Sequence, residues 1–202
     1  MDYSQYGEQY FILNYFENKK GVFVDIGAAD GINNSNTKKL IENGWSGLLV
    51  EPTPVNYNKL LELHSDNDDI IIENCGCGDI STKSTFYIDN NDEYHQISTF
   101  LEEQKKGCEN YYKCTFNEIT VELINTTELL VKHNLTNIDF ISIDTEGYDE
   151  KVLLGIDFDK ININLICIES ITSLGETLLQ SKHYELTHKT SGNLFYKKNN
   201  NT

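Results

Sequence analysis

The 202-residue chain contains no arginine, only two prolines, and no apolar run of the length that a bilayer requires. All 16 of its basic residues are lysines, against 32 acidic residues, and the formal net charge is −16. Nucleic-acid-binding proteins depend on clustered positive charge, and phosphate sites favour the arginine fork, so we expect no nucleic-acid partner. Because a membrane-spanning helix needs about 20 apolar residues, we also expect no membrane insertion.

The chain has an odd number of cysteines. Five cysteines in a chain whose first residues are polar, with no signal-peptide pattern, predict a reducing, cytoplasmic location. Cys75 and Cys77 are closer together than a zinc knuckle allows, and no second pair lies at a matching distance, so we expect no structural metal site. The length suits one α/β domain, which we place over residues 1–198, with a disordered tail over 199–202.

Apolar segments of strand length alternate with segments of helical periodicity. Tyr6, Tyr10, Leu13 and Phe16 recur at helical spacing, and a long polar connection without a clear pattern covers residues 90–117. This alternation predicts an α/β fold with a mostly parallel sheet, right-handed crossovers and helices on both faces. The strands are expected at 22–27, 47–51, 70–75, 85–89, 118–123, 138–144, 164–169, 184–188 and 193–197.

The segment VFVDIGAADG, residues 22–31, joins an apolar strand to a glycine turn. Gly27 and Gly31 lack the side chains that would keep a ligand away from the backbone, and the following helix brings free N–H groups to the same place. A dinucleotide-binding turn would read G-x-G-x-x-G, with an acid about 20 residues later that binds the ribose. Here the spacing is G-x-x-x-G, and Glu51 stands at the distance of the ribose-binding acid.

Acidic side chains surround this turn. Asp25, Asp30 and Glu51 disfavour a pyrophosphate but suit a cationic sulfonium and a ribose diol, which predicts S-adenosylmethionine as the cofactor. An NAD-dependent reductase is the competing interpretation, and it would require a second glycine where Ala29 stands. A plain strand–turn–helix corner is the structural alternative, because glycines occur at such corners for steric reasons alone.

Five segments follow one another in a characteristic order: YSQYGEQYFI, GVFVDIGAADGINNSNT, GWSGLLVEPTPVNYNKL, IDFISIDTEGYDEKVLLGIDF and LICIE. In this order and spacing the chain resembles the FkbM family of S-adenosylmethionine-dependent methyltransferases. The resemblance implies a Rossmann-like class I methyltransferase fold with a mostly parallel seven-stranded sheet and a C-terminal antiparallel hairpin. It also implies that the glycine turn and the acid of the E-P block contact the cofactor, and that the D-x-E-G block faces the reaction site. Family members act largely on sugars and natural products, which predicts a small-molecule or glycan acceptor.

The carboxyl ends of the first three strands carry the candidate cofactor-binding residues, because ligands of open parallel sheets bind beyond those ends. Asn74 and Cys75 are expected to border the adenine, with Asp79 as the acceptor for its amino group. A simple strand-to-turn transition is the alternative interpretation of NCGCGD. The predicted cofactor-binding residues are Asp25, Gly27, Ala28, Asp30, Gly31, Asn36, Glu51, Asn74, Cys75 and Asp79.

The block IDTEGYDE places four acids directly after an apolar strand. Methyl transfer to a hydroxyl requires that the nucleophile lose its proton, and we predict Asp144 as the general base. Glu146 and Glu169 are predicted to bind the acceptor. Carboxylates here could instead hold Mg²⁺, which would acidify the hydroxyl, but we favour a metal-free base. Asp149 and Glu150 are expected only to stabilise the first turn of a helix.

His95 lies in the long polar connection, where a lid over the substrate is expected. Because histidine is well matched to proton removal near neutral pH, we predict a catalytic role for it. The predicted activity is therefore an S-adenosylmethionine-dependent O-methyltransferase that acts on a sugar or glycan hydroxyl. An N-methyltransferase and a non-catalytic module that binds an adenosine cofactor stay open as alternatives, and the sequence does not determine the oligomeric state.

Overall fold

The computed structural model describes residues 1–17, 19–90 and 95–199. Seven strands form the main sheet in the order β3-β2-β1-β7-β8-β10-β9. Five of them are parallel, and β10 runs antiparallel to both β8 and β9. The predicted fold class, including the C-terminal antiparallel hairpin, is confirmed. The strands are β1 (Val22–Ile26), β2 (Ser46–Val50), β3 (Ile70–Glu73), β7 (Asn137–Ile143), β8 (Asn162–Ile168), β9 (Tyr184–Lys189) and β10 (Leu194–Lys198).

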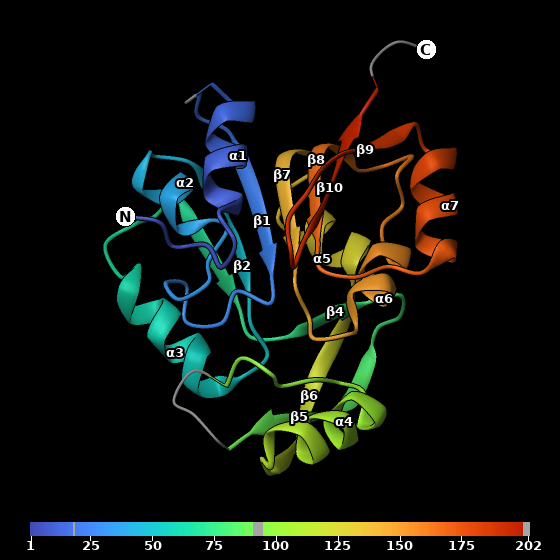
Figure 1. The fold of residues 1–202 in the computed structure, drawn as a ribbon. Coiled ribbons are helices and arrows are strands. Elements are labelled where there is room, and N and C mark those ends of the chain that lie inside the picture. Colours follow the sequence, from blue (N-terminus) through green and yellow to red (C-terminus); the bar gives the residue numbers. More distant parts are fainter. Residues whose placement is uncertain (18, 91–94, 200–202) are drawn as a thin grey trace.

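Two hydrophobic cores cover the two faces of this sheet. Successive side chains of a strand point to opposite faces, so Phe23 of β1 belongs to one core and Val24 to the other. The Phe23 core includes residues of α1 (Glu8–Tyr15), α2 (Lys38–Glu42) and α3 (Pro54–Leu63). The Val24 core includes residues of α5 (Thr126–Lys132), α6 (Asp149–Leu154) and α7 (Ser173–Ser181). Figure 1 shows these two helix groups on either side of the sheet.

A second, smaller sheet lies beyond the carboxyl ends of the parallel strands (Figure 1). It contains β4 (Gly76–Gly78), β6 (Phe116–Asn125) and β5 (Thr82–Asp89), in that order, and α4 (Glu102–Tyr112) connects β5 to β6. The connection over 90–117, in which the sequence shows no clear pattern, therefore contains a helix. Cys108 is the only buried residue of α4, so the helix has no apolar stripe that the sequence pattern could reveal. Residues 91–94 of the connection lie outside the described part.

The end of the chain is described up to Asn199. The Asn199 N–H donates to the carbonyl oxygen of His183 over 2.9 Å, and residues 200–202 of the predicted tail lie outside the described residues. Within 1–17, 19–90 and 95–199, no helix has the length and apolar character needed to cross a bilayer.

The end of α6 packs against the smaller sheet through a close backbone contact at Gly155. A Cβ at this position would lie 2.0 Å from the carbonyl oxygen of Gly78 in β4. We therefore expect Gly155→Ala to lower the free energy of unfolding by about 1–3 kcal/mol, as overpacking does in tight interiors. Urea denaturation measures this change.

Gly107→Ala is the matched control for this substitution. A Cβ at Gly107, inside α4, meets no atom within 4 Å. Because alanine favours the helix, the free energy of unfolding of this variant should rise by up to about 1 kcal/mol. A Gly155→Ala protein as stable as the wild type would contradict the steric argument.

Candidate active site

A cleft of about 620 Å³ opens at the carboxyl ends of β1, β7 and β8. The glycine turn, the loop 33–36, the N-terminal segment and the β9–β10 turn contribute to its wall. A smaller cavity of about 50 Å³ lies on the side of β2 and is lined by Glu51, Cys75 and His95 among others. Gly27 and Glu146 line both spaces, which therefore lie side by side.

Gly27 occupies the point where β1 and β7 end side by side. Its φ is 92°, and a Cβ would lie 1.8 Å from the carbonyl oxygen of Asp144. The N–H groups of Gly27 and Ala28 both donate to the carbonyl of Val50, over 3.0 and 3.1 Å. The glycine is thus required by the backbone itself, in addition to any ligand. As a result the turn and Asp144 are held in direct contact.

Glu51 lies just beyond β2, with its carboxylate held by two backbone N–H groups. Ala29 donates to Oε2 over 2.9 Å, and Thr53 donates to Oε1 over 2.7 Å. Burial raises the pKa of Glu51, while hydrogen bonds from Thr53 and Ala29 and the nearby His95 oppose the rise. The carboxylate is therefore fixed at the wall of the smaller cavity, where the remaining lone pairs of its oxygens can accept further hydrogen bonds.

The S-N-T motif after the glycine turn holds polar groups beneath the main cleft. The Thr37 hydroxyl donates to the carboxylate of Asp25, and the Asn36 amide donates to Ser142 Oγ over 3.1 Å. Burial raises the pKa of Asp25 to about 6, and the Thr37 hydrogen bond works against this rise. Sequence reasoning selected Asp25 and Asn36 but missed Thr37 and Ser142, although the S-N-T spacing was a signal for Thr37.

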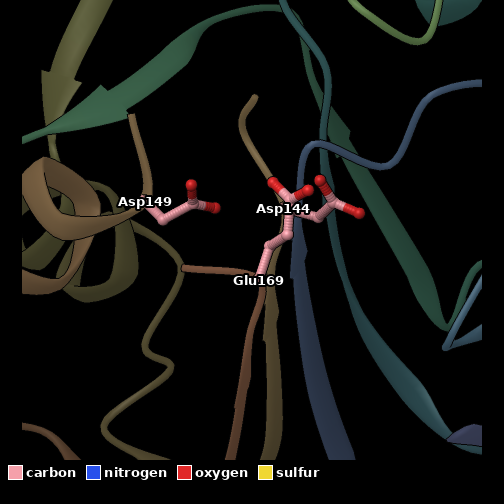
Figure 2. Close-up of side chains that lie close together, drawn as sticks. All are labelled: Asp144, Asp149 and Glu169. Atoms are coloured by element: carbon pink, nitrogen blue, oxygen red, sulfur yellow. The ribbon is translucent and has the colours of Figure 1, made fainter. Parts of the chain in front are cut away.

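Four carboxyl side chains gather where β7 and β8 end. Figure 2 shows Asp144 after β7, Glu169 after β8 and Asp149 at the start of α6, with Asp149 projecting toward the other two. Burial, followed by the charge of Glu169, raises the pKa of Asp144 well above its ordinary value. Burial and neighbouring carboxylates also raise the pKa of Glu146 to about 8 and that of Glu169 to about 7. One oxygen from each of Asp144, Asp149 and Glu169 lies within 4.8 Å of the others, a spacing that could hold a metal ion.

Asp149 is the member of this group with the most hydrogen bonds to its own surroundings. It accepts from the N–H of Thr145 over 3.0 Å, from the N–H of Gly147 over 3.2 Å and from Ser170 Oγ over 3.3 Å. These bonds close the turn that leads into α6. Asp149 therefore has a clear structural task at the beginning of this helix, as the sequence suggested.

Asp30 and Gly31 shape the turn and line neither cavity. Asp30 Oδ1 accepts from the N–H groups of Ile32 and Asn33, each over 2.9 Å. A Cβ at Gly31 would lie 2.6 Å from Leu60 Cδ2, so Gly31 allows α3 to pack closely. Both residues stabilise the conformation of the turn from outside the cavities.

Asn74 and Asp79 also lie outside the two linings. The Asn74 amide donates to the carbonyl oxygen of Glu51 over 2.8 Å. Asp79 forms an ion pair with Lys151 at 2.9 Å. Of the other predicted cofactor-binding residues, Ala28 and Asn36 line the main cleft.

His95 lines the smaller cavity, together with Glu51, and is absent from the lining of the main cleft. Its Nδ1 forms a hydrogen bond with the carbonyl oxygen of Asp89. The structure thus brings His95 to the β2 side of the site, whereas Glu169 lines only the main cleft.

The carboxyl cluster should make stability depend on pH. The pKa of Glu146 is raised from 4.5 to about 8, so the folded state holds more protons than the unfolded state between these values. The free energy of unfolding should therefore fall as pH rises across this range, by up to about 1.4 kcal/mol per pH unit for each such carboxyl. Urea denaturation at pH 5 and pH 8, with no cofactor added, measures the slope.

Glu146→Gln should flatten this slope, and Glu103→Gln on the exposed surface of α4 is the matched control that should keep it. An unchanged slope in Glu146→Gln would show that Glu146 does not titrate in this range.

Solved structures resemble this fold over nearly its whole length. Escherichia coli YhhF, described as a methyltransferase, has a TM-score of 0.52 and 9% identity, covering 98% of this chain and 89% of its own. A methyltransferase from Geobacter sulfurreducens has a TM-score of 0.51 and 10% identity, covering 95% and 76%. M. capricolum TrmK, solved with S-adenosylhomocysteine, has a TM-score of 0.49 and 14% identity, covering 94% and 68%. At such identities the likeness shows the fold alone.

No curated protein sequence matches the chain. The family model described as the methyltransferase FkbM domain matches residues 25–186, which includes the glycine turn, Glu51 and the carboxyl cluster. The family match confirms the predicted cofactor, S-adenosylmethionine. The chain therefore belongs to the FkbM family and is a methyltransferase.

Proposed function

We propose that this methyltransferase transfers the methyl group of S-adenosylmethionine to a hydroxyl group of a neutral sugar or glycan. The observation that carries the proposal is the carboxyl cluster: proton acceptors with raised pKa values line the same cleft as the glycine turn. A general base works best when its pKa lies near the operating pH, and the pKa values of this cluster are all raised from their ordinary acidic range: well above the ordinary value for Asp144, to about 8 for Glu146 and to about 7 for Glu169.

The cofactor would lie across both spaces. Asp25 and the Gly27 turn would hold the methionine end, since a buried carboxyl group and a side-chain-free turn suit its ammonium group. Glu51 would accept hydrogen bonds from the ribose hydroxyls, and the wall beside Cys75 would border the adenine. His95 lies on this side of the site, which favours a contact with the cofactor over the role of base.

Bound S-adenosylmethionine would supply the methyl group, which the acceptor oxygen would receive as the carbon–sulfur bond breaks. The hydroxyl proton would pass to a carboxylate, for which we propose Asp144, because this residue lines both the main cleft and the smaller cavity. Glu146 and Glu169 would accept hydrogen bonds from neighbouring hydroxyls of the acceptor. The positive charge on the sulfonium is lost as the proton reaches the carboxylate, so charge balances within the site.

The lining of the cleft supports a neutral acceptor. Among the described residues around it, none is basic, while amide side chains such as Gln96, Gln104 and Asn33 are frequent. A phosphate-rich acceptor would meet carboxylates without a compensating cation, which disfavours DNA and RNA. An amine acceptor would suit the same acids, so an N-methyltransferase is the second candidate. Screens of sugars and amines for a methyl gain distinguish the two.

A cation held by Asp144, Asp149 and Glu169 is the other use of the cluster. The hydrogen bonds that Asp149 accepts occupy lone pairs that a metal would need, and this favours the metal-free base. We also propose a reducing, cytoplasmic location, which the five free and buried cysteines support.

Cofactor affinity tests the assignment of Glu51. Glu51→Gln should weaken the binding of S-adenosylmethionine by about 1.5–3 kcal/mol, because it replaces charged hydrogen bonds to the ribose by neutral ones. Isothermal titration calorimetry measures the change. Asp79→Asn, outside both cavities, is the control and should bind as the wild type does. Equal affinity in the two variants would argue against Glu51 as the ribose-binding group.

Turnover tests the base. Asp144→Asn should lower kcat by at least about 100-fold while S-adenosylmethionine still binds, the low end for a positioned proton acceptor. The assay is mass spectrometry of sugar acceptors for a 14-dalton gain, run with and without a chelator. If activity is lost with a chelator and returns with Mg²⁺, the carboxyl cluster holds a metal ion, and Asp144 is not a metal-free base. Full turnover by Asp144→Asn would show that Asp144 is neither the base nor a required metal ligand.

A further inference from the structure

We propose that Tyr6 and Tyr112 form an aromatic subsite that binds the sugar unit next to the one that is methylated. The inference rests on the proposed function and adds to it that the acceptor contains at least two neutral sugar units. Both side chains line the main cleft, although one belongs to the N-terminal segment and the other to the end of α4. Tyr6 is 49% exposed and Tyr112 is 57% exposed, so each ring has an open surface.

The direction of α4 places Tyr112 away from the reacting groups. Gln104, in the first half of α4, lies against the turn after Glu146, because a Cβ at Gly147 would be 3.7 Å from Gln104 Cδ. Tyr112 follows eight residues later and lines the same cleft, and eight residues of helix advance roughly 12 Å. This distance exceeds the width of one pyranose ring. A sugar unit beside Glu146 would therefore need a second unit to reach Tyr112.

Tyr6 is held in place by a fixed support. Its ring lies against Gly192 in the β9–β10 turn, where a Cβ would be 2.6 Å from Tyr6 Cε2. The Tyr6 N–H donates to Glu8 Oε2 over 2.8 Å. Glu8 is fully buried, and its Oε1 accepts from Thr190 Oγ1 over 2.6 Å and from Asn193 Nδ2 over 3.1 Å. Glu8 thus joins the N-terminal segment to the hairpin and keeps the ring at the cleft.

The chemistry around the two rings suits a saccharide. Aromatic faces pack against the apolar C–H face of a pyranose, and the amide groups of Gln5, Gln96 and Gln104 can both donate to and accept from hydroxyls. Bases of a nucleic acid would also stack on tyrosine, but they bring phosphates that need a positively charged groove. Among the described lining residues, no basic side chain provides one.

The test measures whether affinity grows with acceptor length. Wild-type protein saturated with S-adenosylhomocysteine is titrated with neutral mannose, glucose, galactose and N-acetylglucosamine series of one to three units, and dissociation constants are taken from NMR. For one series the trisaccharide should bind at least roughly tenfold more tightly than the monosaccharide, which is ~1.4 kcal/mol. Tyr6→Ala and Tyr112→Ala should each remove most of this gain. Tyr6→Phe and Tyr112→Phe should keep it, because stacking needs the ring and not the hydroxyl.

Two further variants separate the subsite from a general effect on folding. Tyr10→Ala is the matched control, because Tyr10 is 59% exposed and does not line the cleft, and it should keep the gain. Gly192→Ala should lower the gain without removing any ring, because the new methyl group displaces Tyr6. Thermal unfolding confirms that each variant is folded.

The outcomes are distinguishable. Binding of S-adenosylhomocysteine without a length-dependent gain in any series would overturn the subsite alone, as would a gain that survives in a Tyr6→Ala, Tyr112→Ala double variant. A wild-type protein that fails to bind S-adenosylhomocysteine would contradict the proposed function, and the subsite with it.

Discussion

The contact between Gly27 and the carbonyl of Asp144 determines how the rest of the site is built. The N–H of Asp144 donates to the carbonyl of Ile26 over 3.0 Å, so the central strands β1 and β7 stay paired up to their last residues. A side chain at Gly27 would force them apart. Because they stay together, the turn that follows β1 and the acids that follow β7 share one cleft. Backbone packing alone thereby places the glycine turn and Asp144 at adjacent positions.

The burial of carboxyl groups is the energetic consequence of this arrangement. Asp25, Asp144 and Glu146 all have pKa values raised chiefly by burial, and few described hydrogen bonds compensate for the lost hydration. Such groups destabilise the empty protein when they are ionised. A bound sulfonium would reverse the sign of this interaction, since an opposite charge favours the ionised form. A positively charged cofactor would therefore relieve the cost of burying these ionised carboxyl groups, and this would strengthen its binding.

Sequence reasoning succeeded where residue type and position are linked by the geometry of parallel strands. Strand ends converge at one edge of a sheet, so Asp25, Glu51 and Asp144 could be placed together from their positions after apolar runs. The prediction that Asp79 binds the adenine did not foresee its ion pair with Lys151. This partner lies 72 residues further along the chain, and the local sequence around Asp79 does not indicate it. The helix α4 escaped prediction because it buries only Cys108 and so lacks a periodic apolar signal. The N-terminal wall at Tyr6 depends on contacts with residues more than 180 positions away, which local patterns cannot reveal.

The Glu8 hydrogen bonds connect residues that are 182 and 185 positions apart in the chain. Closing so large a loop is entropically costly before the intervening sheet has formed. The β1–β2 pair, by contrast, joins residues that are only 24 positions apart, such as Val22 and Ser46. During folding, this part of the site can therefore form early, while the wall that carries Tyr6 forms only when the last hairpin forms.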